Sequence, residues 1–239
     1  MKIVIAPDSF KESLSAIEVA QSIQAGLERV WPDAEFLKVP VADGGEGTVQ
    51  SLIDATSGQK VFTEVTGPLG KPVQAFYGVL GDNKTAVIEM AEASGLHLVP
   101  AEKRDPKITT SFGTGELIKH ALNQGVTKLI GGLGGSATND AGAGMLAALG
   151  VTFLDKTGEE FVPVGGASLA NLESVDTSKL DPRLKQCEVV VACDVDNPLC
   201  GDKGASAVFG PQKGATEQDV ALLDKSLEIF GQVLSLIHI

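Results

Sequence analysis

The stretch that decides the fold is Gly131-Gly132-Leu133-Gly134-Gly135-Ser136-Ala137-Thr138-Asn139-Asp140-Ala141-Gly142-Ala143-Gly144. The apolar run before it, 126–130, predicts a short buried strand, and the run after it, 145–149, predicts a helix. Glycine lets backbone N–H groups approach an anion closely, and a helix N-terminus adds a partial positive charge. The pattern therefore predicts a turn between a strand and a helix. The residues leave open whether this turn binds a phosphate or carboxylate or only packs tightly.

The composition favours an α/β protein with a small-molecule substrate. The chain has 239 residues, enough for one large domain or two small ones, and 43% of them are hydrophobic, which is ample for a core. A net charge of −12 argues against a nucleic acid or a membrane surface as partner, because both are polyanions. A small anionic substrate remains compatible, since a backbone cradle and Mg²⁺ can outweigh the global charge.

The cysteines and the absence of targeting signals predict a cytoplasmic protein. Cys187, Cys193 and Cys200 match no paired zinc-ligand pattern, and a reduced compartment is the simplest interpretation. Cys193 lies in an apolar run and is expected in the core. We find no signal peptide and no apolar run long enough to span a bilayer.

The first 59 residues predict a β-α-β-α order and therefore a parallel sheet. The run 2–6 is continuously apolar, as expected of a strand buried on both faces. Ser15 with Glu18 three residues later forms a capping box that predicts a helix start, and this helix is expected to run to about Val30. The next expected elements are a strand at 35–41 and a helix at about 48–55.

The pattern of apolar and polar residues changes at Lys60, and we therefore predict a domain boundary near residue 59. From 60 to 88 the sequence alternates between apolar and polar residues and carries turn signals, so it predicts antiparallel hairpins. The stretch 161–185 is expected to be irregular. The remaining expected elements are a helix opened by the glycine-and-hydroxyl turn 109–116, strands at 151–155 and 188–193, and an amphipathic helix at 217–233.

The last six residues, 234–239, predict a non-native tail. They back-translate to CTGTCTCTTATACACATC, which resembles a transposon-type sequencing adaptor read in frame. The predicted helix also breaks off at this point without a cap. We therefore expect the native match to end at about Val233; a natural apolar C-terminus is the alternative.

Three acidic residues directly follow apolar strands: Asp8, Asp43 and Asp194. Because open α/β sheets bind ligands at the carboxyl ends of their strands, these residues and the glycine turn could share one rim. A single Asp after a strand is more often a cap or turn residue, but several together favour function. The chemistry that fits is phosphoryl transfer, which needs an anion cradle, a carboxylate for Mg²⁺ and a carboxylate that orients the attacking hydroxyl.

A rival pattern predicts an NAD-dependent dehydrogenase. The turn Gly132–Ala137 matches G-x-G-x-x-[GA] after a strand, and Asp155 ends the following strand at about the right distance. Against this, Thr138-Asn139-Asp140 follows at once and puts a carboxylate near the place of the pyrophosphate. No P-loop signature and no protein-kinase signature occurs in the sequence.

Six motifs closely resemble those of the bacterial type I glycerate kinases, and the resemblance covers residues 1–233. They are Ala6-Pro7-Asp8-Ser9-Phe10-Lys11, Val41-Ala42-Asp43-Gly44-Gly45-Glu46-Gly47-Thr48, Thr66-Gly67-Pro68-Leu69-Gly70, Gly134-Gly135-Ser136-Ala137-Thr138-Asn139-Asp140, Ala192-Cys193-Asp194-Val195 with Asn197-Pro198-Leu199, and Gly210-Pro211-Gln212-Lys213-Gly214-Ala215.

The resemblance implies transfer of the ATP γ-phosphate to D-glycerate with Mg²⁺, at the 2-hydroxyl rather than the 3-hydroxyl. It also implies two α/β domains with a cleft between them. One is Rossmann-like with a parallel sheet; 1–59 is its N-terminal part, and its C-terminal part is expected to be missing. The other, 60–233, is larger and contains the hairpins. Members of the family continue through a segment resembling T-G-E-G-R-x-D, so we expect this chain to be shortened at its C-terminus. An inactive fragment is the alternative. A monomer or a homodimer is expected.

The resemblance also carries residue roles. The expected catalytic residues are Asp194, as the base or hydroxyl-orienting carboxylate, Asp43 and Lys11. Asp8 and Asp43 are the expected metal ligands. The expected substrate-binding residues are Asp8, Ser9, Gly134, Gly135, Ser136, Thr138 and Asn139.

Overall fold

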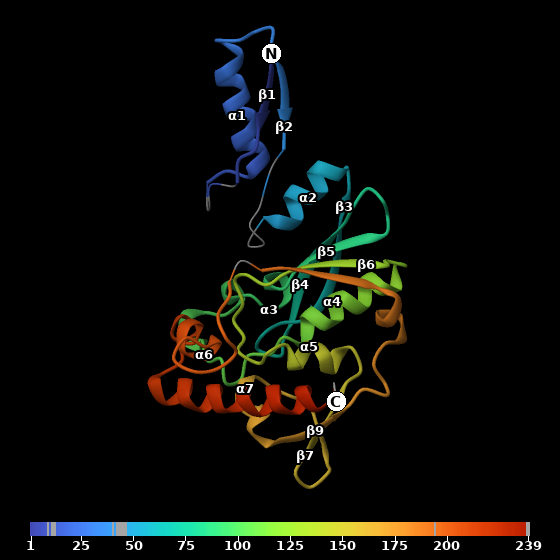
Figure 1. Cartoon of the computed structure of the whole chain (residues 1–239), viewed down its shortest axis with the longest axis vertical. Helices are drawn as coiled ribbons and strands as arrows, with labels where there is room; N and C mark the ends of the chain where they lie inside the picture. The colour runs from blue at the N-terminus through green and yellow to red at the C-terminus, as the bar shows by residue number, and fades with distance from the viewer. Residues whose placement is uncertain (9, 11–12, 40, 42–46, 194, 238–239) are drawn as a thin grey trace.

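The computed structural model describes residues 1–8, 10, 13–39, 41, 47–193 and 195–237. Within these residues the chain is a mixed α/β protein with a two-stranded parallel sheet, a five-stranded mixed sheet and a three-stranded antiparallel sheet (Figure 1). The predicted α/β class with parallel and antiparallel parts is confirmed. Among the described helices, none is long and apolar enough to cross a membrane.

The N-terminal unit consists of β1 (Lys2–Ile5), α1 (Ala16–Glu28) and β2 (Glu35–Lys38), with β1 and β2 parallel. The predicted capping box is confirmed: the Ser15 hydroxyl accepts from the Glu18 N–H, and the Glu18 carboxylate accepts from the Ser15 N–H at 2.8 Å. The prediction that β1 is buried on both faces is wrong, because Val4 is 58% exposed. Successive side chains point to opposite faces, and of the residues of β1 only Ile5 is buried.

The five-stranded sheet has the order β10-β6-β5-β4-β3. The pairs β3–β4 and β4–β5 are antiparallel, which confirms the predicted hairpins, whereas β5–β6 and β6–β10 are parallel. The change of direction at β5 places the ends of the three parallel strands at one edge. The strands are β3 (Gln59–Thr66), β4 (Pro72–Val79), β5 (Thr85–Glu89), β6 (Lys128–Gly132) and β10 (Glu188–Ala192).

Helices cover both faces of this sheet. On one face, Val49 and Ile53 of α2 (Thr48–Thr56) pack against Val87 of β5. On the other, α4 (Phe112–Asn123) and α3 (Ala91–Ser94) pack over the neighbouring residues of β5 in the largest core cluster. Alternate residues of β5 therefore belong to different clusters, and all five of its residues are buried. The helix α2 packs on strands that lie beyond the predicted boundary at residue 59, and the division into domains stays a prediction.

The third sheet has the order β8-β7-β9 and packs against α5 (Ala143–Ala148) and α7 (Glu217–Ile237). The prediction that 161–185 is irregular is wrong in part, because β9 pairs antiparallel with β7. The strands are β7 (Thr152–Asp155), β8 (Glu160–Phe161) and β9 (Leu172–Asp176). The short remaining elements are α6 (Ala205–Phe209) and the 3₁₀ turns η1 (Leu96–Leu98), η2 (Ala101–Lys103), η3 (Gly166–Asn171), η4 (Pro182–Gln186) and η5 (Pro211–Lys213).

The edge strand β10 is more exposed than its apolar sequence predicts. Val189, Val190 and Val191 are 57%, 40% and 52% exposed, because β10 pairs with β6 alone and helices do not cover these side chains. Cys193, which directly follows β10, is exposed, so its predicted place in the core is wrong. In α7 the helix continues past Val233 to Ile237.

Candidate functional site

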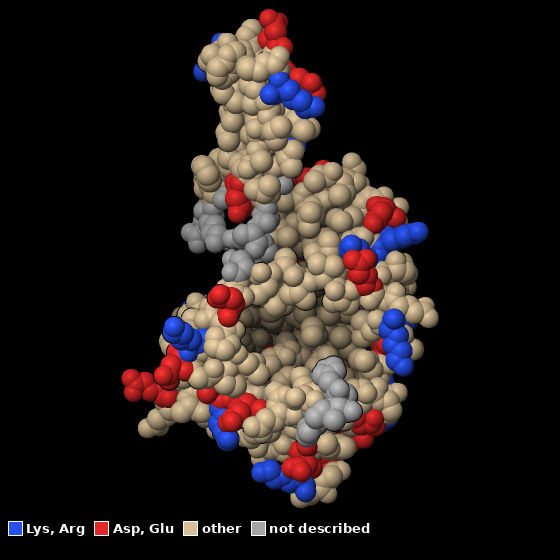
Figure 2. Space-filling view, in the orientation of Figure 1, with Lys and Arg blue, Asp and Glu red and all other residues tan. Residues whose placement is uncertain are grey.

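The candidate site lies at the edge where β5, β6 and β10 end. Glu89, Gly132 and Ala192, the last residues of these strands, are neighbours in the register of the sheet. The loops after β6 and β10 therefore start side by side, as the sequence predicts for the carboxyl ends of parallel strands. Figure 2 shows a hollow on the face of the molecule where Figure 1 shows the space between β10 and α7, and the surface inside it is largely uncharged.

The predicted acidic residues at this edge are only partly described. Asp194, which follows β10, and Asp43, Ser9 and Lys11 lie outside the described residues. Asp8 is described and exposed, and it follows β1, which belongs to the two-stranded sheet rather than to the central one. The gathering of the three aspartates on one rim and their roles therefore stay predictions.

The glycine-rich loop after β6 is fixed to the two segments beside it. The Leu96 N–H donates to the Gly135 carbonyl at 2.8 Å, and the Ala137 N–H donates to the Ser94 carbonyl at 2.8 Å. From the other side, the Thr109 hydroxyl donates to the Ala137 carbonyl at 2.8 Å. The loop thus has a defined shape that the chain itself determines, as a preorganised site requires.

Asp140 occupies the start of α5. Its carboxylate is 1% exposed and accepts from the Ser111 N–H at 3.0 Å and the Ser111 hydroxyl at 2.7 Å. It also accepts from the N–H groups of Gly142 at 3.1 Å and Gly144 at 3.3 Å. The N-terminus of α5 is therefore bound by a carboxylate of the chain itself. The predicted contribution of this helix N-terminus to anion binding is not supported, because Asp140 takes the place of the ligand.

The same geometry argues against the dehydrogenase alternative. A dinucleotide would place its pyrophosphate at the helix start that Asp140 occupies. Asp155 lies on β7, in a different sheet from β6, and its carboxylate accepts from N–H groups in its own turn, those of Thr157 and Glu159. It cannot act as the ribose-binding acid at the end of a neighbouring parallel strand.

Lys213 is the site residue that the sequence analysis missed. It comes from η5, after α6, and only 6% of it is exposed. Its Nζ donates to the Ser136 hydroxyl at 2.9 Å and to the Thr138 carbonyl at 2.5 Å. Burial lowers the pKa of Lys213 to about 8, and the charge of Asp140 acts in the opposite direction. The signal was present in the motif Gly210–Ala215, but no role was assigned to its lysine.

The start of the glycine-rich loop, Gly134–Ser136, carries polar groups that are not used inside the core. Gly134 and Gly135 are exposed, and Ser136 is half-buried. Among the described residues, none accepts a hydrogen bond from the N–H groups of Gly134 or Gly135, whereas Ser136 closes a hydrogen-bonded turn that begins at Leu133. Gly135 has a φ of +73°, a conformation that glycine adopts without strain. The arrangement offers two N–H donors and a hydroxyl in an exposed or half-buried loop, with the ammonium of Lys213 bonded to that hydroxyl, and this donor set suits an anion.

Two other predicted substrate-binding residues face inward. Thr138 and Asn139 are each 6% exposed. The Asn139 side chain donates to the Ser206 hydroxyl at 2.9 Å and so connects the loop to α6. Their contact with substrate stays a prediction, whereas the structure shows that they hold the loop against α6 and η5.

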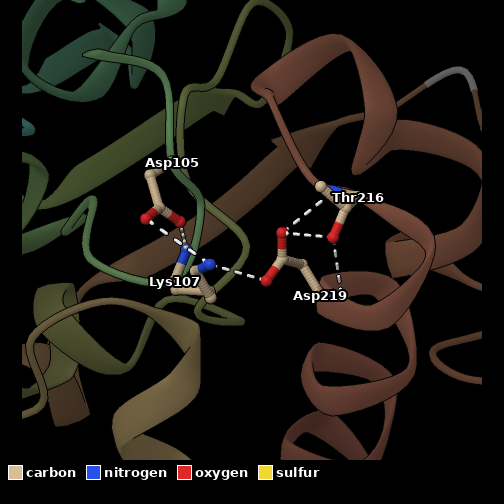
Figure 3. A network of polar contacts seen from close by, with 4 residues as sticks. All are labelled: Asp105, Lys107, Thr216 and Asp219. Atoms are coloured by element: carbon tan, nitrogen blue, oxygen red, sulfur yellow. Dashed lines mark hydrogen bonds and ion pairs between the residues drawn. The ribbon is translucent and has the colours of Figure 1, made fainter.

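A network of polar contacts links the start of α7, which follows η5 and its Lys213, to the connector 105–107 (Figure 3). The Lys107 ammonium donates to the Asp219 carboxylate at 2.6 Å and lies 3.7 Å from that of Asp105. Asp219 also accepts from the N–H and hydroxyl of Thr216, at 2.9 and 2.7 Å, which caps the start of α7. The hydrogen bond from Lys107 is the main reason that the pKa of Asp219 falls to about 2. The network ties α7, directly after η5, to the connector 105–107.

A second buried carboxylate at this edge fixes α2. Glu89 is 6% exposed, and its carboxylate accepts from the Val49 N–H at 2.7 Å. A role for Glu89 at the site was not predicted from the sequence. Glu89 holds the first turn of α2, which follows directly on the segment that contains Asp43.

The described residues provide no metal site. Among them, no three His, Cys, Asp or Glu side chains lie close enough together to hold an ion. The donors of the loop are N–H groups, a hydroxyl and an ammonium, which do not fit a cation. The predicted Mg²⁺ ligand Asp43 lies outside the described residues, so the Mg²⁺ site stays a prediction and we derive no step from it.

Comparison with known proteins agrees with the motifs. The model of the glycerate kinase family matches residues 3–237. A glycerate kinase of Haemophilus influenzae is 61% identical over 233 residues, and a glycerate 2-kinase of Escherichia coli is 60% identical over 234 residues. Each alignment covers 98% of this chain but 61% of the relative, so the chain spans about three fifths of the length of these proteins.

The fold of this chain is also similar to that of a solved structure. The crystal structure of a "putative glycerate kinase 2" from Salmonella typhimurium LT2 superimposes with a TM-score of 0.95 at 57% identity. The match covers 100% of this chain and 64% of that chain. Because the family model matches nearly the whole of this chain, the chain belongs to the glycerate kinase family.

Proposed function

We propose that the chain contributes the glycerate-binding loop of an ATP-dependent kinase that phosphorylates D-glycerate at its 2-hydroxyl. The observation that carries the proposal is the loop Gly134–Ser136 with Lys213 behind it, a surface of anion-binding groups at the carboxyl edge of the sheet. The name of the Escherichia coli relative, glycerate 2-kinase, supports the choice of hydroxyl.

The proposed reaction is a direct phosphoryl transfer. The hydroxyl oxygen on C2 of glycerate forms a bond to the γ-phosphorus of ATP as the bond from that phosphorus to the bridging oxygen breaks. The products are 2-phosphoglycerate and ADP, and the hydroxyl proton is released to a base. We assign the base to Asp194, and substrate or metal positioning to Asp8 and Asp43. Bound Mg²⁺ would neutralise charge on the phosphates of ATP.

The proposal places the protein in the cytoplasm as a monomer or a homodimer. Two features of the chain support this location. The net charge of −12 disfavours binding to nucleic acid or anionic membranes. All three cysteines are free, as in a reducing compartment.

The substitution Asp194→Asn tests the proposed role of the base. We expect a loss of at least about a hundredfold in kcat with an unchanged thermal melting curve, since removing a general base typically costs that much. ADP release is followed in a coupled assay, and phosphorus NMR tells 2-phosphoglycerate from 3-phosphoglycerate. The matched control is Asp196→Asn, two residues further along and exposed, which should retain activity.

Three outcomes would contradict parts of the proposal. A near-wild-type kcat in Asp194→Asn contradicts the role of Asp194. A folded wild-type chain that binds D-glycerate calorimetrically but releases no ADP contradicts the transfer step. Binding of NAD(H) without any use of ATP would contradict the kinase proposal altogether.

A further inference from the structure

Among the described residues, none places a carboxylate within 4.0 Å of the buried ammonium of Lys213. Asp140 is the acidic group that influences it, but the Asp140 carboxylate already accepts four hydrogen bonds from Ser111, Gly142 and Gly144. A buried charge without a partner is costly, so its presence calls for an explanation.

A purely structural role does not explain the charge. Because the pKa of Lys213 is lowered to about 8, the folded state binds its proton less tightly than the unfolded state does. Stability is therefore reduced below pH 8 and is recovered as the pH rises from about 8 towards the ordinary lysine value.

Among the described residues, acceptors are present for two of the three N–H donors of the Lys213 ammonium. Lysine carries three N–H donors, and two of them are used by the Ser136 hydroxyl and the Thr138 carbonyl. Among the described residues, none accepts the third. Since Ser136 uses its oxygen to accept from Lys213, its own proton is available to a ligand. The backbone N–H groups of Gly134 and Gly135 lie in the same loop and are also without acceptors in the described chain.

We propose that Lys213 is a substrate-binding residue, and that with Ser136 and the N–H groups of Gly134 and Gly135 it binds the carboxylate of a small hydroxy acid. One ammonium with neutral donors matches the single charge and two oxygens of a carboxylate. A polyphosphate brings several charges and would leave most of them unmatched here. The inference rests on the proposed function in taking glycerate as the hydroxy acid, and it specifies which end of the substrate this loop holds.

Calorimetric titration of the whole chain tests the assignment. In Lys213→Met we expect the Kd of D-glycerate to rise at least tenfold and the Kd of ADP to change less than twofold. Lys225→Met is the matched control, because Lys225 is exposed and pairs only with Glu228 one turn further along α7. Weakened ADP binding with unchanged glycerate binding would assign the loop to phosphate instead and overturn the proposal, as would unchanged binding of both.

Proton uptake on binding of D-glycerate is measured in the wild-type chain, so this test does not depend on the folding of a variant. Burial lowers the pKa of Lys213 to about 8, and a bound carboxylate would raise it. D-Glycerate titrations at several pH values on either side of pH 8, in buffers of different ionisation enthalpy, should therefore show uptake of a fraction of a proton in the wild type. Among the described residues, the charged group that acts on Lys213 is Asp140 on the loop. Lys213→Met retains Asp140, so its loss of uptake would locate the proton on Lys213.

A second ligand separates this inference from the proposed function. D-Lactate carries the same carboxylate and 2-hydroxyl but lacks the terminal hydroxyl, and glycerol lacks the carboxylate. Binding of D-lactate with proton uptake, together with no transfer from ATP to D-glycerate, would support the site while the kinase proposal fails. Phosphorylation of D-glycerate by Lys213→Met with an unchanged KM would overturn the site while the kinase proposal stands. Absence of proton uptake in a wild type that binds D-glycerate would also overturn it.

Discussion

At the scale of single residues, Asp140 connects the starts of two helices. Its carboxylate accepts from Ser111, directly before α4, and from Gly142 and Gly144 at the start of α5. The Ser111 hydroxyl in turn accepts from the Met145 N–H at 3.0 Å. Each helix start has N–H groups that lack partners inside the helix, and one buried carboxylate satisfies several of them. The shape of the binding loop depends on this connection.

We expect Asp140→Asn to lower the free energy of unfolding by about 3 kcal/mol. The amide keeps one acceptor oxygen but directs an NH₂ group at N–H or O–H donors, and charge-assisted bonds are lost. Urea unfolding followed by circular dichroism measures the change. The control is Asp176→Asn, an exposed turn carboxylate bound to Ser178, for which a loss below about 1 kcal/mol is expected. Equal losses in the two variants would contradict the role of Asp140.

The sequence predicts residues well where their partners are near in the chain. Ser15 and Glu18 are three residues apart, and their capping box is present as predicted. Lys213 was missed because its partners Ser136 and Thr138 are 77 and 75 residues away. A lysine between glycines is typical of an exposed turn, and only the packing of η5 against the loop shows that it is buried.

At the scale of elements, α4 and α5 approach each other through glycine. A methyl group on Gly115 of α4 would lie 2.4 Å from the Met145 carbonyl oxygen and 2.7 Å from the Ala148 side chain. On the opposite helix, a methyl group on Gly144 would lie 2.4 Å from the Thr110 hydroxyl. Both glycines are required by the distance between the helices, because larger residues would push apart the segments that hold the loop.

A pair of glycine substitutions tests this packing. We expect Gly115→Ala to destabilise the protein by about 2 kcal/mol, since the forced separation outweighs the better helix propensity of alanine. Gly26→Ala in α1 is the matched change with nothing within 4 Å of the added methyl group. It should stabilise the protein by up to about 1 kcal/mol. Thermal unfolding followed by calorimetry gives both values, and stabilisation by Gly115→Ala would show that the helices can separate freely.

The helices and strands that were predicted correctly are those with a strong local pattern in the sequence. Alternation from 60 to 88 and glycine or proline turns predicted β3, β4 and β5, and the antiparallel pairing confirms them. The strand β9 was missed because only Leu172 of its five residues is buried, so the alternation is weak. The strand β10 was predicted from its valines, but their exposure depends on which neighbours cover them, which a single segment does not encode.

At the scale of the whole molecule, the hydrophobic core is unevenly distributed. All three core clusters consist of residues from Val49 onward. The unit of β1, α1 and β2 is seen at one end of Figure 1, and its buried apolar side chains are those of Ile5, Ala16, Val19 and Ala20. Two strands and one helix bury too little apolar surface to be stable alone. The binding loop, in contrast, is fixed to the well-packed part.

This asymmetry predicts that the N-terminal unit opens before the rest of the protein unfolds. We expect amides in Lys2–Ile5 of β1 to exchange with deuterium at least about a hundredfold faster than those in Lys128–Gly132 of β6, because few buried contacts oppose local opening. Among the described strands, β1 pairs with β2 alone and β6 pairs on both sides, so the comparison is made between the amides that donate to a neighbouring parallel strand. Mass spectrometry of peptic fragments resolves the two segments. Equal protection, lost together at the same denaturant concentration, would show instead that one cooperative unit extends from β1 through the central sheet.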